Sequence, residues 1–223
     1  LISFLFLALA FSMKSEAKVT LPSILGDNMV LQQQAEVKLW GKARSNATVT
    51  VKTSWNGQTY KSSSDGKGGW SLTVSTPVAG GPYKIIFNDG ELLTLQNVLI
   101  GEVWFCSGQS NMEMPMGGFD RQPVRGTNDI MYTTDSKDGR WVRQFSKTPV
   151  EDCQGEWLEN TPVNVSHISA VSYYFARYIQ EVLEVPVGIV VSTWGGSKVE
   201  AWMSRESIKP FSSIDLSILD NDA

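Results

Sequence analysis

The chain has 223 residues, a formal net charge of −4, two cysteines and one histidine, His167. The mildly acidic balance gives no electrostatic signature of nucleic-acid or anionic-membrane binding, and two cysteines are too few for a four-cysteine zinc site or a disulfide framework. Because 42% of the residues are hydrophobic and only 19% are charged, a packed globular core is expected. A Ser-His reaction carried out by this chain alone would have to use His167 as its base.

Residues 1–12 are nearly all apolar and are followed by a short polar stretch that ends at Ala17. Twelve apolar residues are too few to cross a bilayer, which takes about 20 in a helix. Small residues at Ser15 and Ala17 are typical of a secretory cleavage site. We therefore expect residues 1–17 to be a signal peptide that lacks its basic n-region. The mature protein is then expected to be exported to the periplasm or the medium. In a eukaryote it would be lysosomal or secreted. No membrane contact is expected after the signal peptide is removed.

Residues 18–97 show the pattern of short strands and tight turns. Period-two alternation or β-rich composition predicts strands at residues 36–40, 48–52, 70–74, 83–87 and 92–95. Dipeptides such as Asn56-Gly57 and Asp65-Gly66 supply the positive φ that hairpin turns require. Strands at this spacing predict a small antiparallel β-sandwich domain over residues 18–97.

The second part of the chain, residues 98–223, has the pattern of an α/β domain. Residues 98–106 form a near-continuous apolar run, typical of a strand buried on both faces of a parallel sheet, and residues 187–191 form a second one. An amphipathic helix is predicted between them, because apolar side chains recur at helical spacing: Val171, Tyr174, Phe175, Tyr178, Ile179 and Val182. We expect Ser166 or Ser169 to cap this helix and Pro186 to end it.

Strand, loop, helix and strand in this order make one βαβ crossover, which requires a parallel sheet covered on both faces. One crossover does not complete such a sheet. The sequence therefore predicts an incomplete α/β domain, with further strands expected after Ala223.

A serine-containing turn, Gly108-Gln109-Ser110-Asn111-Met112, directly follows the first buried strand. A serine at the carboxyl end of a parallel strand exposes its hydroxyl where α/β proteins bind ligands, and its own N–H can face an oxyanion. Met112 stands where the nucleophile elbow of the α/β-hydrolases has its second glycine. By itself the pattern also fits a serine that only shapes a turn.

The stretch VLIGEVWFCSGQSNM, residues 98–112, resembles the first block of the SGNH-type esterases, and most closely that of the sialate O-acetylesterase family. Three further stretches resemble that family in the same order, at residues 29–41, 169–176 and 186–202. The resemblance implies an SGNH-hydrolase-like parallel sheet preceded by a β-domain. It also implies a serine carboxylic-ester hydrolase that removes O-acetyl groups from sugars, chiefly sialic acid, without a metal or organic cofactor.

The resemblance also implies roles for individual residues. Ser110 is the nucleophile that attacks the acetyl carbonyl, and its N–H stabilises the oxyanion together with an N–H at Gly195 or Gly196. Oxyanion or substrate contacts are further expected from the neighbours of these residues, Gln109, Asn111, Trp194 and Trp202. Glu113 and Glu200 could contact substrate, but we expect them to face solvent or to cap helices.

The acid-base half of the family's site is not found at its expected place. The family carries a Trp-Tyr-Gln-Gly-Glu stretch and a late Asp-x-x-His pair beyond the second block. Residues 153–156 imitate part of the former but precede the predicted helix. His167 also precedes it, with Asn164 rather than Asp three residues earlier, so we expect His167 to be a cap or surface residue. The chain is therefore expected to be an N-terminal fragment that is inactive alone.

Two alternatives to a sialate esterase remain open from the sequence. One is an esterase of acetylated plant polysaccharide of the acetylxylan type, which uses the same serine chemistry. The other is a non-catalytic carbohydrate-binding protein in which residues 18–97 bind the sugar. Export would allow a disulfide between Cys106 and Cys153, but their spacing does not favour it.

Overall fold

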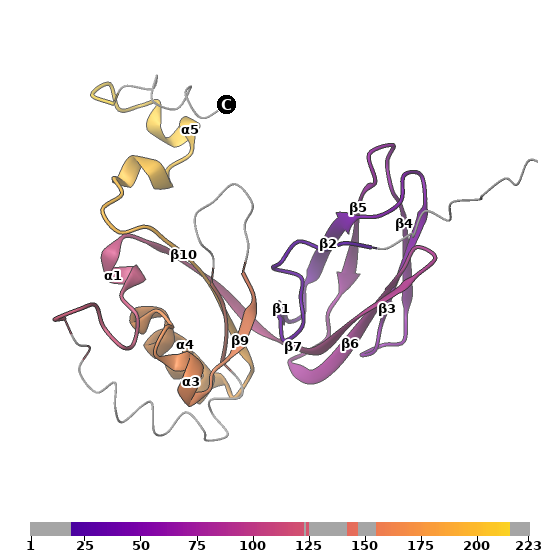
Figure 1. Cartoon of the computed structure of the whole chain (residues 1–223), viewed down its shortest axis with the longest axis horizontal. Coiled ribbons are helices and arrows are strands. Elements are labelled where there is room, and N and C mark those ends of the chain that lie inside the picture. Colours follow the sequence, from indigo (N-terminus) through magenta and orange to yellow (C-terminus); the bar gives the residue numbers. More distant parts are fainter. Residues whose placement is uncertain (1–18, 123, 125–141, 147–154, 215–223) are drawn as a thin grey trace, which may run out of the picture.

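The computed structural model describes residues 19–122, 124, 142–146 and 155–214 (Figure 1). The predicted signal peptide and Cys153 lie outside these residues. Within the described part of the chain, no helix is both long and apolar enough to cross a membrane.

Seven strands come first in the chain: β1 (Val30–Gln32), β2 (Glu36–Lys42), β3 (Thr48–Thr53), β4 (Thr59–Ser63), β5 (Gly69–Ser75), β6 (Gly80–Asn88) and β7 (Leu92–Gly108). The elements that follow are α1 (Ser110–Glu113), β8 (Val142–Ser146), β9 (Trp157–Glu159), α3 (Pro162–Val165), α4 (Ala170–Leu183), β10 (Val187–Thr193), the 3₁₀ helix η2 (Val199–Trp202) and α5 (Arg205–Ile208).

The main sheet has eight strands in the order β4-β3-β6-β7-β10-β8-β9, and β1 pairs with β7 in addition. Strands β3, β4 and β6 are antiparallel to their neighbours, whereas β10 is parallel to both β7 and β8. The predicted α/β fold class is confirmed, with a sheet that is mixed rather than purely parallel. Figure 1 shows β7 running from the antiparallel part of the sheet into the parallel part.

The prediction of two strands at residues 92–95 and 98–106 is wrong, because both belong to the 17-residue strand β7. Asn97, which lies between the two expected strands, has a left-handed φ of +55°. The chain nevertheless stays extended on both sides of it. It pairs with β6 before and just after Asn97, and with β1 and then β10 after it. One long strand thus carries the chain across residue 97.

The first hydrophobic core lies between the two-stranded β2-β5 sheet and the main sheet. Trp70 of β5 packs on Phe87 of β6, with ring centroids 5.9 Å apart. The same core includes Ile100 and Trp157, which come after residue 97, and the Trp157 indole donates a 2.8 Å hydrogen bond to the Ile24 carbonyl. A β-sandwich domain that ends at residue 97 stays a prediction.

Helix α4 covers the parallel strands and encloses the second core. Its predicted position is confirmed, and Ser169 caps it, since its side chain accepts from the Ser172 N–H. The helix packs through Tyr173 and Ala176 against Ile189 and its neighbours on β10. It ends at Leu183, before Pro186.

The apolar side chains whose spacing predicted the helix are not the most buried side chains of α4. Val171, Tyr178 and Val182 are each at least half exposed, whereas the buried positions of α4 include the small residues Ala170, Ser172 and Ala176. Small side chains let a helix axis come close to a sheet, so this stripe faces inward. The larger apolar stripe is more exposed, although Phe175 packs on Trp104 of β7 and Ile179 packs against the second core.

Strand β7 is also less buried than its apolar sequence predicts. Residues 98–101 are buried, but Trp104 and Phe105 are 42% and 67% exposed. Among the described strands, β6 and β1 pair with β7 only as far as Ile100 and Gly101. The end of β7 that leads to the serine turn therefore has a described partner, β10, on one side.

A glycine in β7 allows a close approach of backbones at the entrance to β10. A Cβ built on Gly101 would lie 2.0 Å from the Pro186 carbonyl oxygen, a backbone atom that cannot move aside. We predict that Gly101→Ala lowers the free energy of unfolding by about 1–3 kcal/mol, the usual cost of overpacking. Urea denaturation measures this change. Gly66→Ala is the matched control, since a Cβ there meets nothing within 4 Å. Equal denaturation midpoints for the two variants would contradict the prediction.

Candidate active site

Ser110 lies at the point where the parallel part of β7 ends. Gly108 has a φ of +148°, a conformation that favours glycine, and Gln109 is the N-cap of the single helical turn α1. The N–H groups of Met112 and Glu113 both donate to the Gln109 carbonyl, at 3.0 and 2.9 Å. The chain thus reverses sharply, and the side chain of Ser110 is exposed at the carboxyl edge of the sheet.

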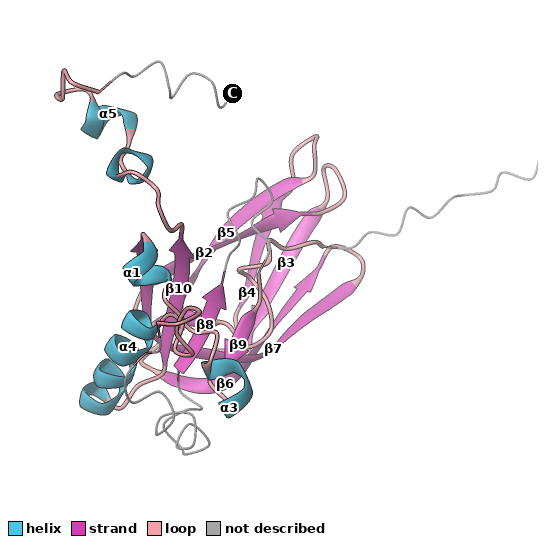
Figure 2. Ribbon diagram, turned by 60° about the vertical axis from the view of Figure 1, so that its left-hand side comes forward, coloured by secondary structure: helices cyan, strands magenta, loops and turns pink. Residues whose placement is uncertain are grey.

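Parallel pairing brings the second motif to the same edge. Strand β10 is in register with β7 up to Thr193 opposite Gly108, and the Trp194 N–H donates to the Gly108 carbonyl at 3.0 Å. A Cβ built on Gly195 would lie 3.8 Å from the Cβ of Ser110. Figure 2 shows α1 beside the end of β10. The structure therefore places Ser110 and Gly195 side by side, although 84 residues separate them in sequence.

The remaining predicted contact residues surround this meeting point. Gln109 and Asn111 flank Ser110 and are exposed. Trp194 is 55% exposed, and Trp202 of η2 is 37% exposed. Trp202 is joined to the glycine turn by a 2.8 Å hydrogen bond from its indole N–H to the Ser197 hydroxyl. Gly196 is exposed and has a φ of +76°.

Glu113 is exposed, as expected, and it also lies close to this site. A Cβ on Gly195 would lie 2.5 Å from Glu113 Oε2, so the carboxylate rests against the bare Cα of this glycine. Ser110 and Glu113 are three residues apart in one helical turn, and residues at this spacing share a helix face. This spacing could have predicted from the sequence that Glu113 lies beside Ser110. Glu200 lies in the first turn of η2 and is half-buried.

His167 lies in the turn between α3 and α4, where its side chain is exposed. Its backbone N–H donates to the Asn164 carbonyl at 3.1 Å, and none of its described contacts reaches Ser110. The surface position that the sequence predicted is confirmed. Cys106 is buried beneath α4. In the described ranges, no three His, Cys, Asp or Glu side chains come together in a way that could hold a metal ion.

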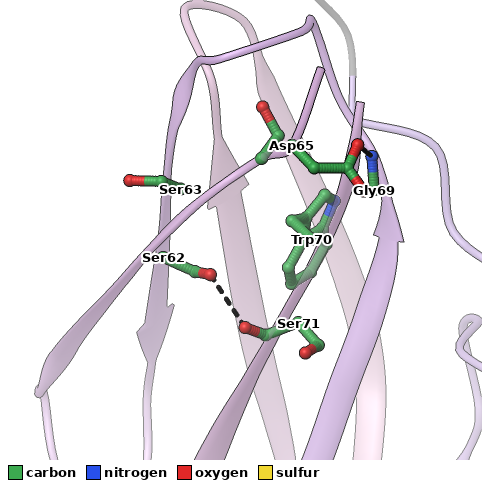
Figure 3. A pocket seen from close by; sticks show the side chains of 7 residues that line it. Ser62, Ser63, Asp65, Gly69, Trp70 and Ser71 are labelled. Carbon is green, nitrogen blue, oxygen red and sulfur yellow. Dashed lines mark hydrogen bonds between the residues drawn. The ribbon is translucent and has the colours of Figure 1, made fainter. Parts of the chain in front are cut away.

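A separate hollow lies at the turn that connects β4 with β5 and is lined by Ser62, Ser63, Ser64, Asp65, Gly69, Trp70 and Ser71 (Figure 3). Its polar groups stabilise this connection: the Ser62 hydroxyl donates to the Ser71 carbonyl, and Asp65 Oδ1 accepts from the N–H groups of Lys67 and Gly69, each at 2.8 Å. Trp70 is only 4% exposed. A ring in this position does not offer a face on which a sugar can stack, so the hollow gives no support to a sugar-binding role.

Asp65 makes the turn between β4 and β5 sensitive to acid. The N–H groups of Gly69 and then Lys67 bond to its carboxylate and hold its pKa below the ordinary value of 3.8. A lowered pKa stabilises the fold above pH 3.8, and this contribution is lost as the pH falls through the folded-state pKa. We predict that a carbon-detected NMR titration gives Asp65 a midpoint below 3.8. A midpoint at or above that value would contradict the hydrogen bonds described here.

Comparison with known proteins finds that the chain is similar to part of several esterases. It is 30% identical over 214 residues to the sialate O-acetylesterase of Homo sapiens and 31% identical over 211 residues to that of Rattus norvegicus. Each match includes 84% of this chain but only 39% and 38% of the relative, so the chain spans well under half of their length. No protein-family model matches the chain.

A solved structure gives the same result for the fold. A carbohydrate acetylesterase from Xanthomonas citri superposes with a TM-score of 0.78 at 33% identity, over 87% of this chain and 44% of that one. The mixed sheet described above is thus consistent with the SGNH-like fold that the motifs implied. Both comparisons confirm the predicted resemblance: over most of its length, this chain is related to the sialate O-acetylesterase family.

Proposed function

We propose that this chain carries the nucleophile half of a carbohydrate O-acetylesterase site, with Ser110 as the attacking residue. The observation that carries the proposal is the meeting of an exposed serine and a glycine turn at the carboxyl ends of two parallel strands. This is the edge at which α/β sheets bind ligands. The names of the relatives, sialate O-acetylesterase and carbohydrate acetylesterase, support the ester chemistry.

The reaction would be acyl transfer through an acetyl-enzyme. Ser110 Oγ attacks the acetyl carbonyl while its proton passes to a base, and a tetrahedral oxyanion forms. The sugar oxygen then leaves with a proton, and water releases acetate from Ser110. Ser110 begins a helical turn, where the first N–H groups have no intrahelical acceptor. This N–H and that of Gly195 or Gly196 would stabilise the oxyanion, and one such donor is worth about 3–4 kcal/mol of barrier.

We expect the base of the proposed reaction to lie outside the described residues. A serine without a base is a weak nucleophile, and His167 is exposed in a turn without a described contact to Ser110. We propose that an acid-base pair from elsewhere in the complete protein accepts the Ser110 proton. Export directed by residues 1–17 is part of the same proposal.

The O-acetyl groups of sialic acid are the first substrate candidate because they give the curated relatives their name. One observation favours the alternative of a neutral acetylated polysaccharide. The Glu113 carboxylate lies against Gly195 and beside Ser110, and a sialate carries a carboxylate of the same sign. Like charges near one another oppose binding, although solvent screens them at an exposed site.

Replacing the nucleophile tests the proposed reaction. In protein produced from the complete reading frame, we expect Ser110→Ala to reduce acetate release from an O-acetylated sugar by up to about 10⁶-fold. Ser63→Ala, an exposed strand serine, is the matched control and should keep the wild-type rate. His167→Ala should also keep it. An undiminished rate in Ser110→Ala would refute the serine mechanism, and a loss in His167→Ala would make that residue the base.

Neutralising Glu113 tests the substrate class. We predict that Glu113→Gln raises kcat/KM for an O-acetyl sialate about threefold relative to a neutral acetylated xyloside, because exposed charge pairs are worth roughly 0.2–1 kcal/mol. Steady-state kinetics on both substrates measure the ratio, and added salt should diminish the difference. A ratio unchanged by the substitution would show that Glu113 does not discriminate between the two sugars.

A further inference from the structure

The turn that carries Gly195 and Gly196 is weakly closed by its own backbone. The Ser197 N–H donates to the Trp194 carbonyl at 3.3 Å, which is beyond the usual range of about 2.7–3.2 Å for such bonds. Gly196 has a φ of +76°, and two adjacent glycines have many accessible backbone conformations. Something other than the turn's backbone bond must hold these two peptide groups in place.

The side chain of Ser197 supplies a stronger closure. Its hydroxyl donates to the same Trp194 carbonyl at 2.7 Å. It also accepts a hydrogen bond of 2.8 Å from the indole N–H of Trp202. Both lengths lie within the range of well-formed hydrogen bonds. The indole bond leaves the hydroxyl proton directed toward Trp194, because the oxygen uses a lone pair for one partner and its proton for the other.

The other end of the turn is attached to the sheet. The Trp194 N–H donates to the Gly108 carbonyl at 3.0 Å, where β7 ends. Trp194 is therefore bonded on one side to the strand that leads into Ser110, and on the other to Ser197. Gly195, the next residue, faces Ser110 with its bare Cα. Any movement of the Trp194 carbonyl changes the position of the Gly195 N–H.

We propose that Ser197 and Trp202 are positioning residues, which hold the Gly195–Gly196 peptide groups at the place where the oxyanion forms. The inference rests on the proposed ester hydrolysis and deepens it. Neither side chain needs to touch the reacting atoms. Trp202 acts through its indole N–H, separately from any stacking of its exposed ring on a sugar.

Two variants isolate the hydrogen bonds. Ser197→Ala removes the hydroxyl, and Trp202→Phe removes the indole N–H but keeps an aromatic ring. In protein from the complete reading frame, each should lower kcat by about tenfold to a hundredfold, because a displacement of 1 Å at a reacting centre costs up to about 10²-fold. KM should stay within about twofold, as expected when an interaction made in the transition state is lost. Ser197→Thr, which restores the hydroxyl, should recover most of kcat.

A matched control separates positioning from stability. Ser62→Ala removes another serine hydroxyl that bonds to a backbone carbonyl at 2.8 Å, between β4 and β5 and away from Ser110, and it should leave kcat unchanged. An NMR spectrum of the indole protons adds a readout that needs no activity: Ser197→Ala should shift the Trp202 indole signal, and Ser62→Ala should not.

The outcomes distinguish the inference from the function on which it rests. If Ser110→Ala keeps the wild-type rate, the proposed function fails, whatever Ser197 does. If Ser110→Ala is inactive but Ser197→Ala and Trp202→Phe keep the wild-type kcat, the positioning role is overturned. A rise in KM alone would also overturn it, since that result would assign these residues to substrate binding.

Discussion

The parallel pairing of β7 with β10 is the constraint on which the site depends. Seven residue pairs, from Val187 opposite Glu102 to Thr193 opposite Gly108, fix the register of the two strands. A shift of one residue would move the glycine turn by about 3.3 Å and reverse the faces of the strand. The close approach of Gly101 to Pro186, and of Gly188 to Val30, leaves little freedom for such a shift. Strand register thus sets the distance between Ser110 and Gly195.

The N-terminal strands contribute to this constraint through β7. Strand β1 pairs in parallel with its middle part, and β6 pairs with its first part, so β7 is held before it reaches the site. The side chains of Gln32 and Gln33 donate to the carboxylate of Glu102, the residue at which the pairing with β10 begins. The β-rich region therefore supports the position of the strand that ends at Ser110.

Local patterns predicted most elements but not their surroundings. The helix at residues 170–183 followed from the spacing of Tyr174 and its neighbours, yet the spacing did not reveal which face packs. The structure buries the small side chains of α4 and exposes much of the larger stripe. Likewise, an apolar composition predicted a strand at Trp104 and Phe105 but not their exposure, which depends on whether another strand lies alongside. Whether a side chain is buried depends on the elements that pack around it, and these elements come from distant parts of the sequence.

The sequence alone indicated which residues could carry the proposed chemistry, because the strand-turn pattern around Ser110 is a local feature of the chain. It also indicated that two parallel strands bring their carboxyl ends together. The tertiary structure decided what surrounds the serine: the Glu113 carboxylate against Gly195, and the hydrogen bonds from Trp202 through Ser197 to Trp194. The first of these contacts depends on the register of strands from distant parts of the chain. The second depends on how the chain folds back after β10, which side-chain periodicity does not specify.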